Sequence, residues 1–478
     1  MNSDEFYTGL QAIAILEGDR PVIYRGIGYT AVLDSYMLAP FYWFLESPIT
    51  LLKLFNAPWW GLTALVAALT SRKYLGLIGM ESRLIPFIVG GVIWITPGGL
   101  LITSTRAWEA YGLLLLGIAV TQYVSLQCVE CGGRTTRESF FLGAAAGFTF
   151  FLHPMTITAT LPMLIVPSFK GRSNLRTFWI PAIAGGLIAN LGTFAWNIKN
   201  HWLTFVSPPP QESYLDRLVR IFTGLLPRGF GFMNYQGTWT VPTISFVLYL
   251  VVLSLCILGI TVLSKKGAFG LSLAVPALLV WPLLANLTPL WFVTDGRYAI
   301  IGIVQSVIVM TFGLHAIAQR FRKMINSGTA LRITAALPAT FAVIWIIAGG
   351  IFWLRANAGP AVDDPNARMR AVTELLESEN VNYAAGNYWH VQPVEYLSGG
   401  DIHVAVAGHP WGAYLEWRPE LPWAVLFPAR QPEVAAQPDT EVAYIFDASD
   451  EQIGTLRMAP EAYTRHQIGS SIVYVPNR

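Results

Sequence analysis

Charged residues are scarce in this chain. Asp, Glu, Lys and Arg together make up 13% of its 478 residues, against roughly 25% in soluble proteins. Hydrophobic residues make up 54%, and apolar stretches long enough to cross ~30 Å of hydrocarbon recur along the first 354 residues. The composition therefore excludes an ordinary soluble protein and predicts an α-helical polytopic membrane protein.

Cysteine is also rare, with three residues in the chain. Cys128 and Cys131 have the spacing of a zinc or redox motif, but no second Cys or His pair accompanies them, and structural zinc needs four ligands. Cys256 lies inside an apolar stretch. The segments 1–47 and 355–478 contain no cysteine, so no disulfide can stabilise them. The cysteines therefore indicate no metal or redox centre.

Basic residues occur in short clusters between the apolar stretches. Five alternate loops carry these clusters, and the positive-inside rule places such loops in the cytoplasm. A net charge of +2 distributed in this way reports topology and does not indicate a nucleic-acid partner. The five loops contain Arg72, Lys73 and Arg83; Arg134 and Arg137; Lys170, Arg172 and Arg176; Lys265 and Lys266; and Arg320, Arg322 and Lys323.

The chain is expected to have three parts. Residues 1–47 form extracytoplasmic juxtamembrane helices with an acidic motif, residues 48–354 form the transmembrane domain, and residues 355–478 form a small extracytoplasmic α/β domain. Because export of the first part needs a preceding span, we expect a further helix upstream of Met1. The expected spans are 48–70, 84–102, 109–127, 139–153, 155–169, 177–197, 239–263, 268–290, 298–318 and 333–354.

Three of the six acidic residues before the first full span are candidates for the chemistry. Asp4 and Glu5 begin an apolar helical pattern that continues to Leu16. Asp34 lies inside a second, otherwise apolar helical stretch, which is a costly placement unless its side chain faces a cavity or a partner. Asp4 and Glu5 could also act only as acids at a helix N-terminus, where they favour the helix dipole. The sequence leaves both interpretations open.

The order of several short motifs resembles one family of membrane enzymes. Asp4 and Glu5 precede two short helices, and Asp34 lies between Gly28-Tyr29 and Ala39-Pro40. This order resembles the GT-C superfamily of polyprenyl-phosphate-sugar-dependent glycosyltransferases, in particular the bacterial branch of protein mannosyltransferases and aminoarabinose transferases (glycosyltransferase family 39). Further similar segments are 104–111 with its arginine, 148–154 ending in His-Pro, 295–298 with an Arg-Tyr pair, and 383–389 with a Tyr-Trp pair.

The resemblance implies roles for the acids. Asp4 would be the general base or a carboxylate that orients the acceptor, because a hydroxyl that attacks an anomeric carbon must lose a proton. Glu5 and Asp34 would orient the acceptor or a metal. The leaving group would be a lipid phosphate, which needs positive charge. The expected catalytic residues are thus Asp4, Glu5 and Asp34, and the expected substrate-binding residues are Tyr29, Arg106, His153, Arg228, Arg297 and Tyr298.

Arg297 is the first candidate for the phosphate ligand. It begins a span directly after Asp295 and Gly296, so its guanidinium can lie along the membrane surface and bind phosphate through two bonds. The alternative is a boundary residue that pairs with Asp295. His153 has a structural alternative too, as a turn residue before Pro154. Lys199, Arg217 and Arg220 are further outer cations, and an amphipathic loop helix accounts for the last two.

The sequence predicts an inverting glycosyltransferase on the outer face of a bacterial plasma membrane. It would transfer a hexosyl or pentosyl group from a polyprenyl-phosphate donor to a lipid, a cell-wall glycan or a protein. A transporter or lipid flippase, and a non-catalytic partner in envelope glycan assembly, are the alternatives; transport favours charges midway through spans and repeated halves. We expect membrane lipids as partners; the sequence establishes no cofactor, and a divalent cation stays open. The tail lacks a phosphate-binding fingerprint and is expected to cover the site or select the acceptor.

Overall fold

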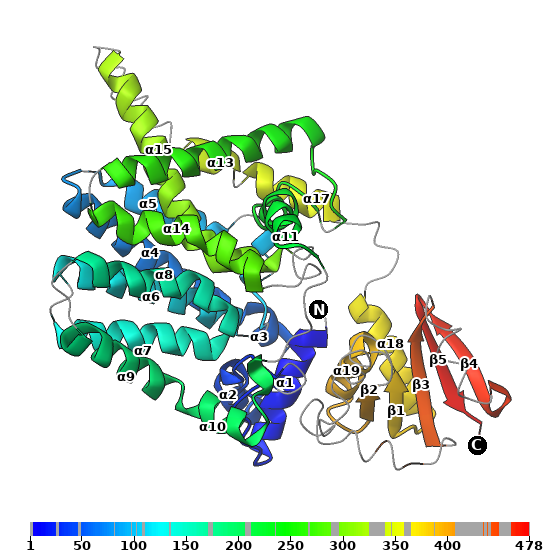
Figure 1. Cartoon of the computed structure of the whole chain (residues 1–478). Coiled ribbons are helices and arrows are strands. Elements are labelled where there is room, and N and C mark those ends of the chain that lie inside the picture. Colours follow the sequence, from blue (N-terminus) through cyan, green and yellow to red (C-terminus); the bar gives the residue numbers. More distant parts are fainter. Residues whose placement is uncertain are drawn as a thin grey trace.

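The structure is a computed structural model of the chain. It describes residues 3–24, 28–45, 49–80, 82–96, 98–101, 103–107, 110–132, 135–170, 175–205, 212–234, 236–265, 268–287, 296–324, 340–345, 347–357, 365–386, 388–406, 434, 437, 441–448 and 460–477. Two parts can be followed in Figure 1: a domain of long helices that lie side by side, and a smaller domain with a β-sheet at the C-terminus.

The helical domain confirms the predicted fold class. Three of its long helices, α4, α6 and α13, are apolar almost all round, as expected for helices surrounded by protein and lipid. The helices of this domain are α4 (Ala57–Leu77), α5 (Leu84–Ile95), α6 (Tyr111–Glu130), α7 (Thr136–Leu152), α8 (Ile157–Lys170), α9 (Ile180–Ala189), α10 (Leu191–Lys199), α11 (Tyr214–Arg220), α12 (Leu226–Gly229), α13 (Pro242–Lys265), α14 (Ala268–Leu287), α15 (Ile300–Met324) and α17 (Trp353–Asn357).

Two expected spans are interrupted. The span predicted over 48–70 is divided into α3 (Ile49–Leu54) and α4, which begins after Asn56. The amide N–H of Asn56 donates to the Thr105 carbonyl at 2.9 Å, and its Nδ2 donates to the Thr103 carbonyl at 3.1 Å. These bonds to another loop replace the helical bonds at the break. A second break at Asn190 bends α9 and α10 by 60°.

The count of spans stays a prediction. Among the described residues, three helices are long and apolar enough to cross a membrane, namely 111–130, 242–265 and 297–321. The bent pair α9 and α10 gives a fourth if it is counted as one span. Shorter apolar helices cover Leu84–Ile95, Pro154–Phe169, Leu273–Leu287 and Thr340–Arg355.

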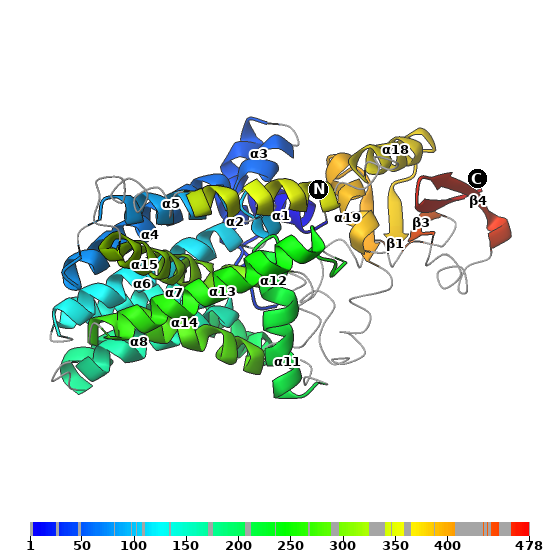
Figure 2. The same cartoon turned by 90° about the horizontal axis from the view of Figure 1, so that it is seen from above.

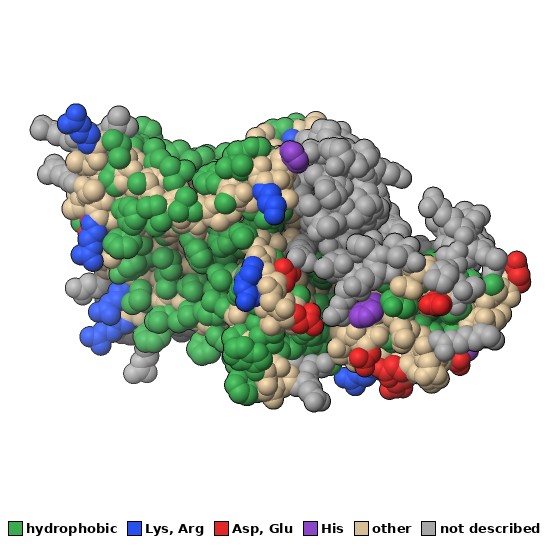
Figure 3. All heavy atoms as spheres, turned by 90° about the horizontal axis from the view of Figure 1, so that it is seen from below, with side chains coloured by type: hydrophobic (Ala, Val, Ile, Leu, Met, Phe, Trp, Pro, Cys, Tyr) green, Lys and Arg blue, Asp and Glu red, His purple; other side chains and the backbone are tan. Residues whose placement is uncertain are grey.

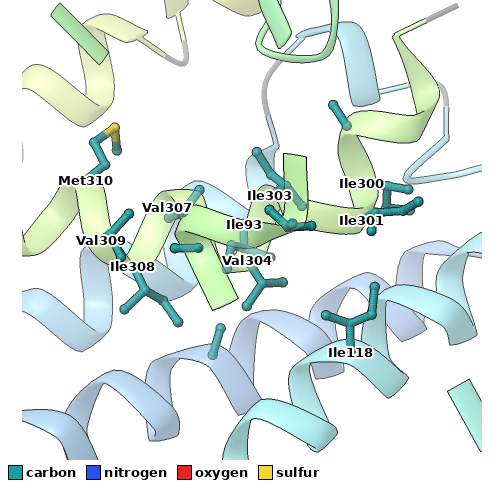
Figure 4. Packing of buried hydrophobic residues seen from close by; sticks show 14 of the residues in the cluster. Ile93, Ile118, Ile300, Ile301, Ile303, Val304, Val307, Ile308, Val309 and Met310 are labelled. Carbon is teal, nitrogen blue, oxygen red and sulfur yellow. The ribbon is translucent and has the colours of Figure 1, made fainter. Parts of the chain in front are cut away.

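The core of the helical domain is built around α15. Ile300, Val304 and Ile308 of this helix are almost completely buried, and Figure 4 shows them among side chains of other helices, including Ile93 of α5 and Ile118 of α6. Burial of such side chains removes apolar area and fills space at close packing. The first turn of α15, which follows Arg297, is therefore fixed relative to α5 and α6.

Short helices lie between the two domains. They are α1 (Ser3–Leu16), α2 (Leu33–Leu38), the 3₁₀ helix η1 (Ala39–Trp43) and α3. Figures 1 and 2 show α1 beside α19 of the tail from two directions. The acidic residues of the N-terminal segment thus lie where the helical domain meets the tail.

The tail is an α/β unit, as the sequence predicts. Its five-stranded sheet has the order β2-β1-β3-β5-β4, in which β1 is parallel to β2 and β3, and the other pairs are antiparallel. Val372, Leu376, Val391 and Val394 on its helices are fully buried. The elements are α18 (Pro365–Ser378), β1 (Tyr383–Gly386), α19 (Tyr388–Leu397), β2 (His403–Val406), β3 (Val442–Asp447), β4 (Tyr463–Ile468) and β5 (Ser471–Pro476).

Charge is distributed unevenly over the surface. In the view of Figure 3, several Lys and Arg side chains lie along the edge of the helical domain that is farthest from the tail, and others lie near the tail, where most of the visible acidic side chains also lie. Much of the helical domain between that edge and the tail is hydrophobic. Which end of the domain is cytoplasmic stays a prediction.

Candidate active site

Glu5 lies on α1 and is completely buried. Its Oε1 accepts a hydrogen bond of 2.8 Å from Nη1 of Arg106, which follows 101 residues later. The Arg106 side chain is partly exposed, at 27%. A buried carboxylate is stable only when it is paired and hydrogen-bonded. Arg106 therefore neutralises Glu5 and fixes α1 against the loop that precedes α6.

The same face of α1 is bonded to α2. Thr8 lies three residues after Glu5, so the two share one side of the helix. The Thr8 and Tyr24 hydroxyls are 3.0 Å apart, and the Ser35 hydroxyl donates to the Thr8 carbonyl at 3.0 Å. These buried bonds fix α1 to the helix that carries Asp34.

Asp34 is buried and accepts one backbone bond. Its Oδ2 accepts from the Ala110 N–H at 2.9 Å, where Ala110 adopts a left-handed conformation (φ 61°) before α6. Its Oδ1 is buried without a hydrogen-bond partner among the described residues. Burial raises the pKa of Asp34 to about 7, and the bond from Ala110 opposes this shift. Asp34 can therefore gain or lose a proton near neutral pH.

His153 follows α7 and is 1% exposed. Its Nδ1 accepts from the Met155 N–H at 3.2 Å, so in the neutral ring the proton is on Nε2. Nε2 is buried and has no hydrogen-bond partner in the described part of the chain. The ring centroid lies 5.1 Å from that of Tyr29, 6.3 Å from Tyr298 and 6.5 Å from Tyr111. His153 thus presents one buried donor inside a cage of tyrosines.

Arg297 is placed at this cage by a tight turn. Gly296 has a φ of 77°, and a Cβ there would lie 2.8 Å from Cβ of Arg228. A Cβ at Gly99 would lie 1.7 Å from the Arg228 carbonyl oxygen. Three distant segments therefore meet through glycine contacts. The Arg297 guanidinium lies 5.3 Å from the Tyr298 ring, and its positive charge acts on His153.

The structure brings together most of the residues predicted for the site. Tyr29, His153 and Tyr298 are in one cluster, Arg297 is beside it, and Arg228 packs against the turn that holds Arg297. Glu5 and Arg106 form an ion pair, and Asp34 bonds the start of α6. Asp4 belongs to α1, but its side chain lies outside the described residues.

Other expected residues are not at the cage. Arg217 is buried and donates to the Asn286 carbonyl at 3.5 Å. Asp295 lies outside the described residues, so its pairing with Arg297 stays a prediction. Sequence reasoning did not assign roles to Tyr111, Tyr24 or the Ala110 amide. The first lies within the segment 104–111 and could have been found, but a backbone amide has no side-chain signal.

The described side chains do not form a metal site. No three His, Cys, Asp or Glu side chains come together within that set. Glu5 is paired with Arg106, and Oδ1 of Asp34 has no hydrogen-bond partner among the described residues. With the side chain of Asp4 outside the set, a divalent cation stays an open question.

Comparisons with known proteins identify the fold. No protein-family model matches the sequence, and no curated protein matches it significantly. The structure is similar to the oligosaccharyltransferase of Archaeoglobus fulgidus (TM-score 0.53, 12% identity, 100% of this chain and 71% of that chain). It is also similar to ArnT from Cupriavidus metallidurans (TM-score 0.57, 8% identity, 98% and 93%). Both have the GT-C fold of membrane glycosyltransferases, and this chain has that fold.

Proposed function

We propose that this protein is a GT-C glycosyltransferase. It transfers a sugar from a polyprenyl-phosphate donor to a lipid, a cell-wall glycan or a protein acceptor on the outer face of a bacterial plasma membrane. The observation that carries the proposal is the convergence of buried acids, a buried His donor and Arg297 at one end of a GT-C helical domain. Acids and cations at one site suit a reaction that removes a proton and releases a phosphate.

The reaction is a single displacement. The acceptor hydroxyl attacks the anomeric carbon, a new C–O bond forms there, and the bond from that carbon to the phosphate oxygen breaks. A carboxylate takes the hydroxyl proton, and the lipid phosphate leaves with the electron pair of the broken bond. Attack from the side opposite the leaving group inverts the anomeric carbon.

The acids have different roles in this proposal. Asp4 is the base. Glu5 is already paired with Arg106, which suits a group that holds α1 in place. Asp34 has a free Oδ1 and a pKa of about 7, so it can orient the acceptor hydroxyl in either protonation state. A purely structural Asp34 would be expected to pair both oxygens.

The phosphate is bound by donors at the tyrosine cage. The Arg297 guanidinium supplies charge that cannot be lost at physiological pH. The Nε2–H of His153 supplies a neutral donor that has no other described partner. Two donors of this kind stabilise the negative charge that develops as the bond to the sugar breaks.

The test is a transfer assay with purified protein in lipid nanodiscs. Radiolabelled polyprenyl-phosphate hexoses and pentoses are supplied with an extract of envelope lipids, glycans and proteins. The expected result is incorporation from one donor class with release of polyprenyl phosphate. Movement of the lipid across vesicle membranes without cleavage of the sugar–phosphate bond would overturn the proposal and favour a flippase.

A further inference from the structure

Two faces of helix α1 contact different parts of the protein. Glu5 and Thr8 lie on one face and contact Arg106 and Tyr24. Phe6 and Gly9 are also three residues apart, so they share a second face. That second face contacts the tail domain. The acid-bearing helix is therefore held between the loop that precedes α6 and the tail.

Tyr396 of the tail packs directly against α1. Tyr396 of α19 is completely buried, and its ring centroid lies 5.1 Å from that of Phe6. A Cβ at Gly9 would lie 2.5 Å from Cε2 of Tyr396. The ring thus rests directly on the backbone of α1, at a position where a larger residue would displace it.

The same residue also contacts the element after α2. The hydroxyl oxygens of Tyr396 and Tyr42 are 2.9 Å apart, across 354 residues of sequence. Tyr42 belongs to η1, which directly continues the helix that carries Asp34. Burial raises the pKa of Tyr396 to about 12 and also raises that of Tyr42, so both hydroxyls remain protonated at neutral pH.

The tail supplies a rigid base for this residue. Val391 and Val394, on the same helix as Tyr396, are fully buried in the tail core with Leu376. A side chain anchored in this way can transmit the position of the tail to the elements that it touches.

We infer that Tyr396 is a positioning residue through which the tail domain sets the spacing of α1 and α2, the two helices that carry the acids. The inference rests on the proposed function for its catalytic consequence. Its structural part, the coupling of tail and acid helices, can be measured without any substrate.

The first experiment is hydrogen–deuterium exchange on the full chain in nanodiscs. Tyr396→Ala should raise the exchange of residues 3–16 and 33–43 by about 10-fold or more, because a buried aromatic contact is lost. Tyr396→Phe, which removes only the hydroxyl, should raise it on the order of 2- to 10-fold. Tyr463→Phe on β4 is the matched control and should leave both segments unchanged. Unchanged exchange in α1 after Tyr396→Ala, with strand protection intact, would overturn the inference.

Gly9→Ala keeps the test decisive if Tyr396→Ala unfolds the tail. The added Cβ would lie 2.5 Å from Cε2 of Tyr396 and 2.6 Å from the Tyr42 hydroxyl, so it should separate both tyrosines from α1 and reproduce the loss of protection in 3–16 and 33–43 while the strands stay protected. Normal protection in both segments would contradict the inference.

The second experiment measures transfer with the labelled donor used above. Tyr396→Phe should lower turnover per folded molecule several-fold at an unchanged half-saturating donor concentration. A contact that serves stability alone would lower the thermal midpoint and leave turnover intact. If coupling is found but the wild type transfers no sugar, the proposed function fails and the coupling stands. If sugar is transferred but α1 is uncoupled, only the inference fails.

Discussion

The two ends of α6 differ in the burial of the polar groups that lie beside them. At its start, the Ala110 amide bonds buried Asp34, near buried Glu5 and His153. At its end, Glu130 pairs with Lys73, and both are partly exposed. The helix separates these ends by about 30 Å. Surface pairs such as the second contribute little energy, whereas buried polar groups from distant segments are costly and indicate a site.

The largest effect is expected from Asp4, at the end of the helical domain where α6 begins (the acidic end). Asp4→Asn keeps size and most hydrogen bonding but removes the proton acceptor, so turnover should fall by roughly two to four orders of magnitude. Membrane insertion should be normal, as checked by yield and gel filtration. Asp19→Asn, beyond the end of α1, is the control. Normal turnover of purified Asp4→Asn would return Asp4 and Glu5 to a structural role.

Arginines at two places should behave differently. Arg297→Ala should weaken binding of polyprenyl phosphate by about 10- to 150-fold, since it removes a charge-assisted bond to phosphate. Arg217→Ala should affect binding much less and stability more, because Arg217 is buried against the Asn286 carbonyl. Titration of labelled polyprenyl phosphate and a thermal melt separate the two. Equal, small effects on binding would leave Arg297 as a boundary residue.

The contribution of the His153 N–H donor to phosphate binding can be measured separately from that of the ring. Gln can place an N–H near the position of Nε2, whereas Asn reaches only the position of Nδ1. His153→Asn should weaken binding of polyprenyl phosphate on the order of 10-fold, and His153→Gln should weaken it less. The same titration measures both variants. Identical losses would indicate that the Nε2–H does not contact the phosphate.

Asp34 should make stability depend on pH. Its pKa is raised from 3.8 to about 7, so the folded state binds more protons than the unfolded state between these values. The free energy of unfolding should therefore fall as pH rises from about 4 to 7 and then level off. The free energy of unfolding of Asp34→Asn should lack this part of the pH dependence. Its value relative to that of the wild type should therefore be higher at pH 8 than at pH 5. Parallel melting curves from pH 5 to 8 would contradict the assignment.

The last prediction concerns thiol labelling at the other end of the helical domain, where α6 ends. Cys131 is exposed and Cys128 is buried beside it. If this end is cytoplasmic, an impermeant maleimide should label Cys131 only after the cells are permeabilised, and Cys128 should stay unlabelled while the protein is folded. Cys131→Ser should abolish the signal. Labelling of intact cells would invert the topology and move the acidic end to the cytoplasm.

Composition and periodicity predict the class of fold, because helices in lipid need long apolar stretches and strands of a sheet alternate between its two faces. The same patterns indicate a functional role for Asp34, because an acidic residue inside an apolar helical stretch is unusual. They do not reveal the break at Asn56, since the bonds that compensate it come from Thr103 and Thr105. They also cannot show that Tyr396 touches α1, because that contact joins segments far apart in the sequence. Contacts between distant segments depend on packing, which a local pattern does not encode.

The most direct test is a structure of the full chain in nanodiscs with polyprenyl phosphate bound. We expect the phosphate at the acidic end, with its oxygens bonded to the Arg297 guanidinium and to Nε2 of His153. The opposite end of the helical domain has a cleft of about 460 Å³, lined in part by Arg72 and Arg83. A phosphate bound only in that cleft, with the tyrosine cage unchanged, would contradict the proposed function.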